Sequence, residues 1–181
     1  MAVNVSARQL AQGSGFVQLV AEALADSAIE PGTLVLEVTE SAVMDDAEAT
    51  LAILKQLKRL GVRLAIDDFG TGYSSLVYLK RFPVDQLKVD RSFVAGLGTN
   101  PDDSAIVASV VSLARAVGVV AIAEGVETRE QLAALQKLGC ELGQGYLWSR
   151  ALPADDIDII LASGGFPIQP VEAISRDGGH S

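Results

Sequence analysis

Residues 63–76 read Arg-Leu-Ala-Ile-Asp-Asp-Phe-Gly-Thr-Gly-Tyr-Ser-Ser-Leu and join a short apolar run to two acids and a glycine-rich turn. The apolar run is typical of a buried β-strand, and Asp67 and Asp68 follow at its C-terminal end. Neighbouring residues of a regular strand point to opposite faces of a sheet, so the backbone must turn if both acids are to face one pocket. Gly70 and Gly72 provide freedom for such a turn, although a purely structural turn would also explain them.

The same pattern, an apolar run that ends in a charged residue, occurs three more times, at 34–37, 87–90 and 121–124. Longer segments separate these runs, and their apolar residues recur at helical spacing, as in 46–60. Strand and helix alternate about six times, which predicts an α/β fold with about six parallel strands and covering helices. Both a (β/α) barrel and an open doubly wound sheet satisfy this pattern.

The expected elements and domain boundaries follow from this alternation. The expected strands are 2–6, 34–39, 63–67, 86–89, 119–123 and 143–147, and the expected helices are 15–25, 46–60, a short one ending at Leu79, 104–117 and 129–138. From Gly164 the composition turns to Gly, Pro, Ser and charged residues. We therefore expect one domain over 1–163 and a mobile tail over 164–181.

The charged strand ends indicate a metal site. All strands of a parallel barrel open on one face, so Glu37, Asp67, Asp68 and Glu124 would converge there. Crowded carboxylates repel one another unless cations neutralise them, and carboxylate and amide oxygens, including that of Asn4, suit a hard ion such as Mg²⁺ or Mn²⁺. Two such ions could hold a phosphodiester and activate a water. The alternative is that each acid only solvates a loop or caps the next helix.

Lys88 lies between two apolar strand residues, Leu87 and Val89, so it points to the face opposite theirs. If that face is the inside of the barrel, Lys88 is a buried cation among acids and can stabilise charge on a phosphoryl oxygen or orient the attacking water. If it is the outside, Lys88 is an ordinary lysine in a groove between helices. The sequence leaves both possibilities open.

Composition excludes several classes of function. The net charge of −9 disfavours a surface that binds a nucleic-acid polymer, and any phosphate ligand would need a metal. The single cysteine, Cys140, fits a reducing, cytoplasmic setting. The apolar stretch 105–123 approaches the length of a membrane span, but it contains Arg115 and Gly118, so we expect a helix followed by a strand and no membrane span.

Six segments, in order over about residues 2–150, carry a family resemblance: 3–6 with Gln9 and Leu10, 37–40, 67–76, 87–90, 123–127 and 143–146. With these segments the chain resembles the EAL domain of cyclic di-GMP signalling. The resemblance implies a modified (β/α)₈ TIM-type barrel that hydrolyses cyclic di-GMP to linear pGpG with two Mg²⁺ or Mn²⁺ ions.

The resemblance also implies a role for individual residues. The metal ligands would be Asn4, Glu37, Asp67 and Asp68. Lys88 would position or activate the water, and Glu124 would be the base or a metal-site ligand. Glu127 and Gln144 would be further pocket residues, and Glu40 would anchor the loop after Asp68, which includes Thr71 and Gly72. That loop contributes to dimer contacts in the family, so we expect a homodimer.

The chain departs from the family at its start. The Glu-Ala-Leu motif that names the family lies upstream of the strand that carries Asn4, and we expect that strand, its neighbour, a ligand Glu and a phosphate-binding Arg to be missing. The triplet at 22–24 is a decoy, because it lies downstream in a helical segment. We therefore expect an incomplete barrel, from a fragment or a truncated paralogue, with impaired phosphodiesterase activity. The alternative function is a non-catalytic module that binds cyclic di-GMP or another protein. An unrelated metal-dependent hydrolase is disfavoured by the run at 67–76.

Overall fold

The computed structural model describes residues 1–72 and 76–164 and contains one six-stranded sheet. Its strands are β1 (Ala2–Val5), β2 (Val35–Thr39), β3 (Arg63–Phe69), β4 (Gln86–Val89), β5 (Val120–Ala123) and β6 (Leu142–Gly143). All neighbouring strands are parallel, and their order in the sheet is their order in the sequence. A doubly wound sheet would reverse its order at a switch point, so the winding is that of a barrel, as predicted. Within the described residues β1 and β6 do not pair with each other, and the sheet stays open.

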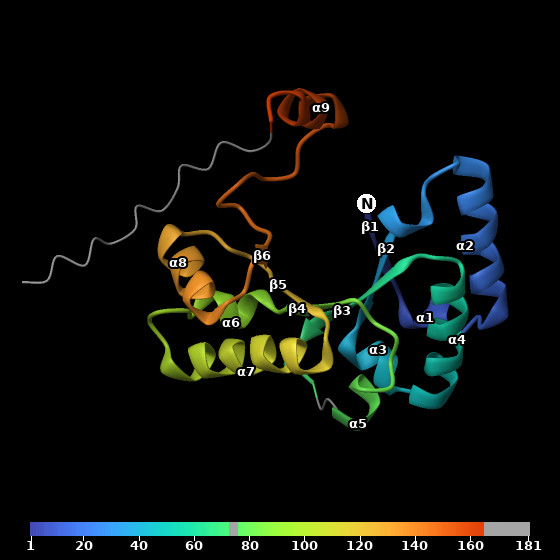
Figure 1. Cartoon of the computed structure of the whole chain (residues 1–181), viewed down its shortest axis with the longest axis horizontal. Helices are drawn as coiled ribbons and strands as arrows, with labels where there is room; N and C mark the ends of the chain where they lie inside the picture. Colours follow the sequence, from blue (N-terminus) through green and yellow to red (C-terminus); the bar gives the residue numbers. More distant parts are fainter. Residues whose placement is uncertain (73–75, 165–181) are drawn as a thin grey trace, which may run out of the picture.

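The helices follow the strands along the chain (Figure 1). They are α1 (Ala7–Leu10), α2 (Ser14–Ser27), α3 (Glu40–Met44), α4 (Ala47–Arg59), α5 (Leu76–Leu79), α6 (Arg91–Ala95), α7 (Pro101–Val117), α8 (Arg129–Leu138) and α9 (Ala154–Ala162), with a 3₁₀ turn at Pro31–Thr33. The sequence predicted the longer helices with ends shifted by a few residues. It missed α1, α3, α6 and α9, and β6 is shorter than the predicted strand 143–147.

The apolar stretch 105–123 is a helix and then a strand, as predicted. Asn100 caps the start of α7 through its side chain, and Pro101 occupies the first helical turn. Gly118 ends the helix with a φ of 78°, a left-handed conformation that glycine adopts without strain. No helix in the described part of the chain is both long and apolar enough to cross a membrane.

The two faces of the sheet differ in chemistry. Alternate residues of the central strands, such as Leu64, Ile66 and Leu87, are fully buried beneath the helices and form the hydrophobic core. The intervening residues point to the opposite face, which carries Glu37 and the other strand-end polar groups. The strands therefore display polar side chains on one face because the helices cover the other.

The C-terminal part of the described chain is α9, which lies apart from the other elements (Figure 1). It has no buried residue, although it contains three isoleucines and a leucine. The predicted mobile tail falls almost wholly on residues 165–181, which lie outside the described residues. The domain boundary at residue 163 stays a prediction.

Candidate active site

Strand register places the first predicted site residues at two successive levels near the C-terminal ends of the strands. Asn4 of β1 pairs with Glu37 of β2, and Thr39 of β2 pairs with Asp67 of β3. Because side chains alternate along a strand, Asn4, Glu37 and Asp67 share the polar face. The parallel arrangement therefore collects these oxygen-bearing side chains at the C-terminal ends of the strands.

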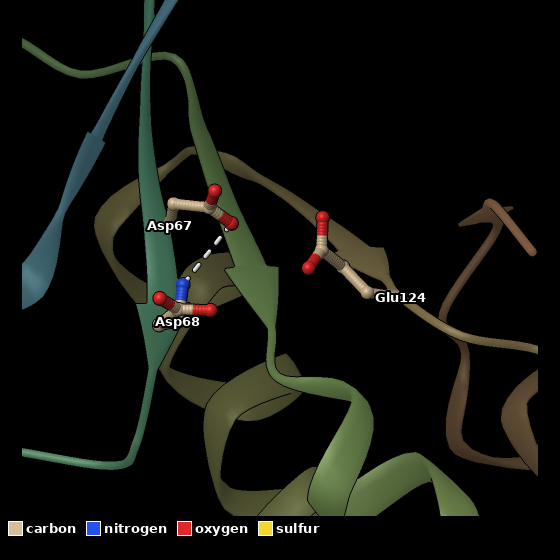
Figure 2. Close-up of side chains that lie close together, drawn as sticks. All are labelled: Asp67, Asp68 and Glu124. Atoms are coloured by element: carbon tan, nitrogen blue, oxygen red, sulfur yellow. Dashed lines mark hydrogen bonds between the residues drawn. The ribbon is translucent and has the colours of Figure 1, made fainter. Parts of the chain in front are cut away.

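Asp67 and Asp68 reach one pocket because the backbone turns between them. The register of β3 against β4 shifts between Ile66 and Phe69, and Asp68 has a φ of 54°, in the left-handed region that non-glycine residues seldom adopt. The Asp68 amide donates a hydrogen bond of 3.1 Å to the Asp67 carboxylate. Figure 2 shows both carboxylates beside that of Glu124, which follows β5. The turn that the sequence required at this point is present.

Three carboxylates lie close enough together to hold a metal ion. One oxygen from each of Asp67, Asp68 and Glu124 lies within 4.8 Å of the others. Burial raises the pKa of the Asp68 carboxyl, and the negative charges of Asp67 and Asp90 raise it further. Burial also raises the pKa of Glu124 above its ordinary value. Asp68 and Glu124 are therefore harder to ionise here than in water.

Lys88 points into the acidic cluster, which is the inward of the two orientations that the sequence left open. Its side chain is 4% exposed, and its ammonium lies 2.7 Å from Glu37, 3.0 Å from Asp67 and 2.6 Å from Glu124. Burial alone would lower the pKa of Lys88, but the three hydrogen bonds outweigh it and raise the pKa above the ordinary value. Lys88 is thus a permanent cation that faces four carboxylates when Asp68 is counted, so the site keeps an excess of negative charge.

Glu40 holds the turn that follows Asp68. It is 1% exposed, and one of its oxygens accepts hydrogen bonds from the amides of Gly70 at 2.9 Å and Gly72 at 3.4 Å. The Thr71 hydroxyl donates to the Asp68 carbonyl at 2.8 Å. A Cβ on Gly72 would lie 2.7 Å from the other Glu40 oxygen, so the turn needs glycine there. Residues 73–75 of the same loop lie outside the described residues.

Asp90, which directly follows β4, behaves as the alternative to a metal site predicted, because it caps the next helix. It caps α6 by accepting a hydrogen bond of 2.9 Å from the Ser92 amide. Burial would raise its pKa, but hydrogen bonds from Ser92 and Asp68 lower it below the ordinary value. Asp90 therefore contacts the cluster through Asp68 and fixes the chain after β4.

A cavity of about 540 Å³ lies beside Glu124. Gln144 lines it and donates a hydrogen bond of 2.6 Å to the Glu124 carboxylate. Glu127 also lines it with an exposed side chain, while its backbone amide donates to Gln131 at 2.8 Å. The sequence did not single out Arg91, which lines the same cavity. The only sequence feature that could have indicated Arg91 is its position directly after Asp90, the charged residue at the end of a predicted strand.

Two residues lie away from these contacts. Asn4 is exposed on the edge strand β1, and within the described residues no hydrogen bond joins its side chain to the cluster. Glu22 lies on α2, which packs on α4 rather than on the polar face, and its carboxylate accepts a hydrogen bond from Gln18 at 2.8 Å. The position of Glu22 agrees with the interpretation of its triplet as a decoy.

Comparison with known proteins bears on this site. The family model described as EAL domain matches residues 1–151. The bifunctional diguanylate cyclase/cyclic di-GMP phosphodiesterase MucR of Pseudomonas aeruginosa is 50% identical over 157 residues, which are 87% of this chain and 23% of MucR. The chain spans about a quarter of the length of the curated relatives that it matches.

Solved structures share both the fold and much of the sequence. The PaMucR phosphodiesterase in complex with c-di-GMP superposes with a TM-score of 0.83 at 51% identity, over 86% of this chain and 63% of that one. The manganese/cy-diGMP complex of Klebsiella pneumoniae BlrP1 superposes with a TM-score of 0.76 at 39% identity, over 82% of this chain and 38% of that one. On its sequence match, its winding and its strand-end site, the chain belongs to the EAL domain family.

Proposed function

We propose that this site binds cyclic di-GMP and hydrolyses it to linear pGpG with the help of two Mg²⁺ or Mn²⁺ ions. The observation that carries the proposal is the buried Lys88 surrounded by carboxylates at the ends of four parallel strands. MucR, a relative at 50% identity, is a cyclic di-GMP phosphodiesterase, and its structure was solved as a c-di-GMP complex. The BlrP1 complex contains manganese, an ion that suits the same oxygen donors.

The donor set fits hard divalent cations. Asp67, Asp68 and Glu124 would hold the ions, and Glu37 and Asn4, which pair with each other in the sheet, would add ligands from the neighbouring strands. The excess negative charge and the raised pKa values of Asp68 and Glu124 favour cation binding, since a divalent ion lowers the cost of ionising both carboxylates. When bound, such ions stabilise the attacking and leaving oxygens of a phosphodiester and acidify a water.

The protein's own groups would then manage the proton and the developing charge. Water attacks the phosphorus, the bond from phosphorus to the 3′ oxygen breaks, the water gives up a proton, and the leaving 3′ oxygen takes up a proton to become a hydroxyl. Glu124 can accept the proton of the water, because burial has raised its pKa toward that of a useful base. Lys88 remains charged, so it orients the water and stabilises the phosphoryl oxygens. Gln144 fixes the Glu124 carboxylate through their hydrogen bond.

The remaining expectations concern the setting of the site. Glu40 holds the turn at Gly70 and Gly72, and we propose that the loop continuing from this turn forms the contact of a homodimer. Light scattering of the purified chain tests this, with Glu40→Ala expected to weaken the dimer. A cytoplasmic location and the domain limit at residue 163 stay predictions.

A non-catalytic module that binds the nucleotide is the second candidate. The observation in its favour is that Asn4 lies exposed on a strand with one open edge, where it makes no hydrogen bond to the cluster within the described residues. An ion held partly by Asn4 would be poorly fixed, and a misplaced charge-stabilising group costs about 3 kcal/mol, or about a hundredfold in rate. The expectation of impaired turnover stays a prediction.

Two measurements separate the candidates. Chromatography of pGpG released in Mn²⁺ tests turnover, with Lys88→Gln as the inactive control. Calorimetry with Mn²⁺, comparing the parent chain with the Asp67→Asn, Asp68→Asn double variant, tests the metal site. Nucleotide binding without pGpG release would favour the binding module, and equal heats from both proteins would remove the metal site from the proposal.

A further inference from the structure

The cavity beside Glu124 contains an arginine and an aromatic ring that the proposed reaction has not used. Arg91, at the start of α6, lines it, and its guanidinium has no ion-pair partner within the described residues. Tyr146, which follows β6, also lines the cavity and is 58% exposed. Exposure of a large aromatic side chain next to a reactive centre is typical of a binding surface.

One face of the Tyr146 ring is already covered. The guanidinium of Arg150 lies 4.4 Å from the ring centroid, in the geometry of a cation–π contact. Because Tyr146 is still 58% exposed as a residue and lines the cavity, the other face of its ring remains available there. A planar ring whose back is supported by a cation is a rigid platform for stacking a second flat group.

The neighbourhood of Arg91 directs its side chain. Gly125, which follows Glu124, has a φ of 65°, and a Cβ there would lie 2.6 Å from the Arg91 Cβ. The glycine therefore lets the Arg91 stem pass directly beside the strand end that carries Glu124. The guanidinium thus belongs to the same cavity as the Tyr146 ring, and five N–H donors meet a stacking platform there.

We propose that Tyr146 stacks one base of the cyclic dinucleotide and that Arg91 donates to the O6 and N7 acceptors of that base, which selects guanine over adenine. Guanine presents two acceptors on this edge, and arginine matches them with two hydrogen bonds, whereas adenine presents an amino donor in place of O6. This inference rests on the proposed function, because it assigns the base specificity of the same site.

The test is calorimetric titration of the whole chain with cyclic di-GMP and with cyclic di-AMP, in Ca²⁺ to hold the nucleotide without adding manganese. Tyr146→Leu keeps the bulk but removes the aromatic face, and it should weaken both nucleotides by about tenfold or more. Tyr146→Phe should bind like the parent chain. Arg91→Ala should weaken cyclic di-GMP by about tenfold or more and leave cyclic di-AMP unchanged. Arg129→Ala removes the same charge from outside the cavity and should change neither.

The outcomes separate this inference from the function on which it rests. If the parent chain binds neither nucleotide, both are overturned. If it binds cyclic di-GMP and the Tyr146→Leu and Arg91→Ala chains bind it equally well, the inference fails and the proposed function stands. If Arg91→Ala weakens both nucleotides equally, Arg91 contacts phosphate and the assignment of base specificity is wrong.

Discussion

Replacing Lys88 with methionine should destabilise the metal-free chain far more than replacing an ordinary paired lysine. The Lys88 ammonium is within 3.0 Å of three carboxylates, and its side chain is 4% exposed. Removing one member of such a buried group leaves the others ionised without a partner, which costs about 3–5 kcal/mol. Lys58 is a matched control, because its ammonium is 2.8 Å from Asp85 but its side chain is 31% exposed. Loss of this exposed ion pair in Lys58→Met should lower the free energy of unfolding by about 1 kcal/mol or less.

Urea unfolding followed by circular dichroism in EDTA measures both costs. Adding Mn²⁺ should then stabilise Lys88→Met more than the parent chain, because an ion bound only by the folded state adds free energy of unfolding in proportion to its affinity, and the unpaired carboxylates bind it more tightly. Equal losses for Lys88→Met and Lys58→Met would refute the description of Lys88 as the cation that holds the cluster together. An identical Mn²⁺ response in the parent and Lys88→Met chains would refute the cation site.

Two further changes test the site without turnover. The pKa of Asp68 is raised in the folded state, so its ionised form costs stability; this cost is absent below its unfolded pKa and appears as pH rises through the folded pKa. Asp68→Asn should therefore raise the free energy of unfolding in EDTA at pH 7 and lose that advantage near pH 3. Asp67→Asn, which loses its contact with Lys88, should not stabilise the chain at either pH. Urea titrations of both variants at pH 7 and pH 3 test this. Gly72→Ala would place a Cβ 2.7 Å from Glu40 and should lower stability by about 1–3 kcal/mol, whereas Gly32→Ala, with no atom within 4 Å, should be nearly neutral in the same urea assay.

The sequence could predict which residues gather at the strand ends because the alternation of side chains and the parallel winding of the strands place them. Alternation along parallel strands puts Glu37, Asp67 and Lys88 on one face, and a barrel brings their ends together. The sequence left open to which face the Lys88 side chain points. Alternation defines two faces of the sheet but does not say which of them the helices cover. The structure decides this through the neighbours of Lys88, Leu87 and Val89, which are fully buried beneath the helices.

What the sequence missed depends on short elements and on contacts between distant segments. Helices α1, α3 and α6 have only four or five residues, too few to show a helical repeat. Their caps were visible, since Ser6, Thr39 and Asp90 each accept a hydrogen bond from an amide of the first turn. The contact from Gln144 to Glu124 joins β6 to β5 across twenty residues, and no local pattern predicts it.

The balance of charge in the site explains why one buried lysine suits a pocket that we propose to bind metal ions. Without Lys88, repulsion among Glu37, Asp67 and Glu124 would push the strand ends apart or protonate them, and the ions would have to assemble the site as they bind. A second buried cation would complete the neutralisation and remove the reason for an ion to enter. A single ammonium, held by three carboxylates, keeps the strand ends in place and leaves Asp68 and the excess charge available. The site can thus be formed before the ions arrive and still attract them.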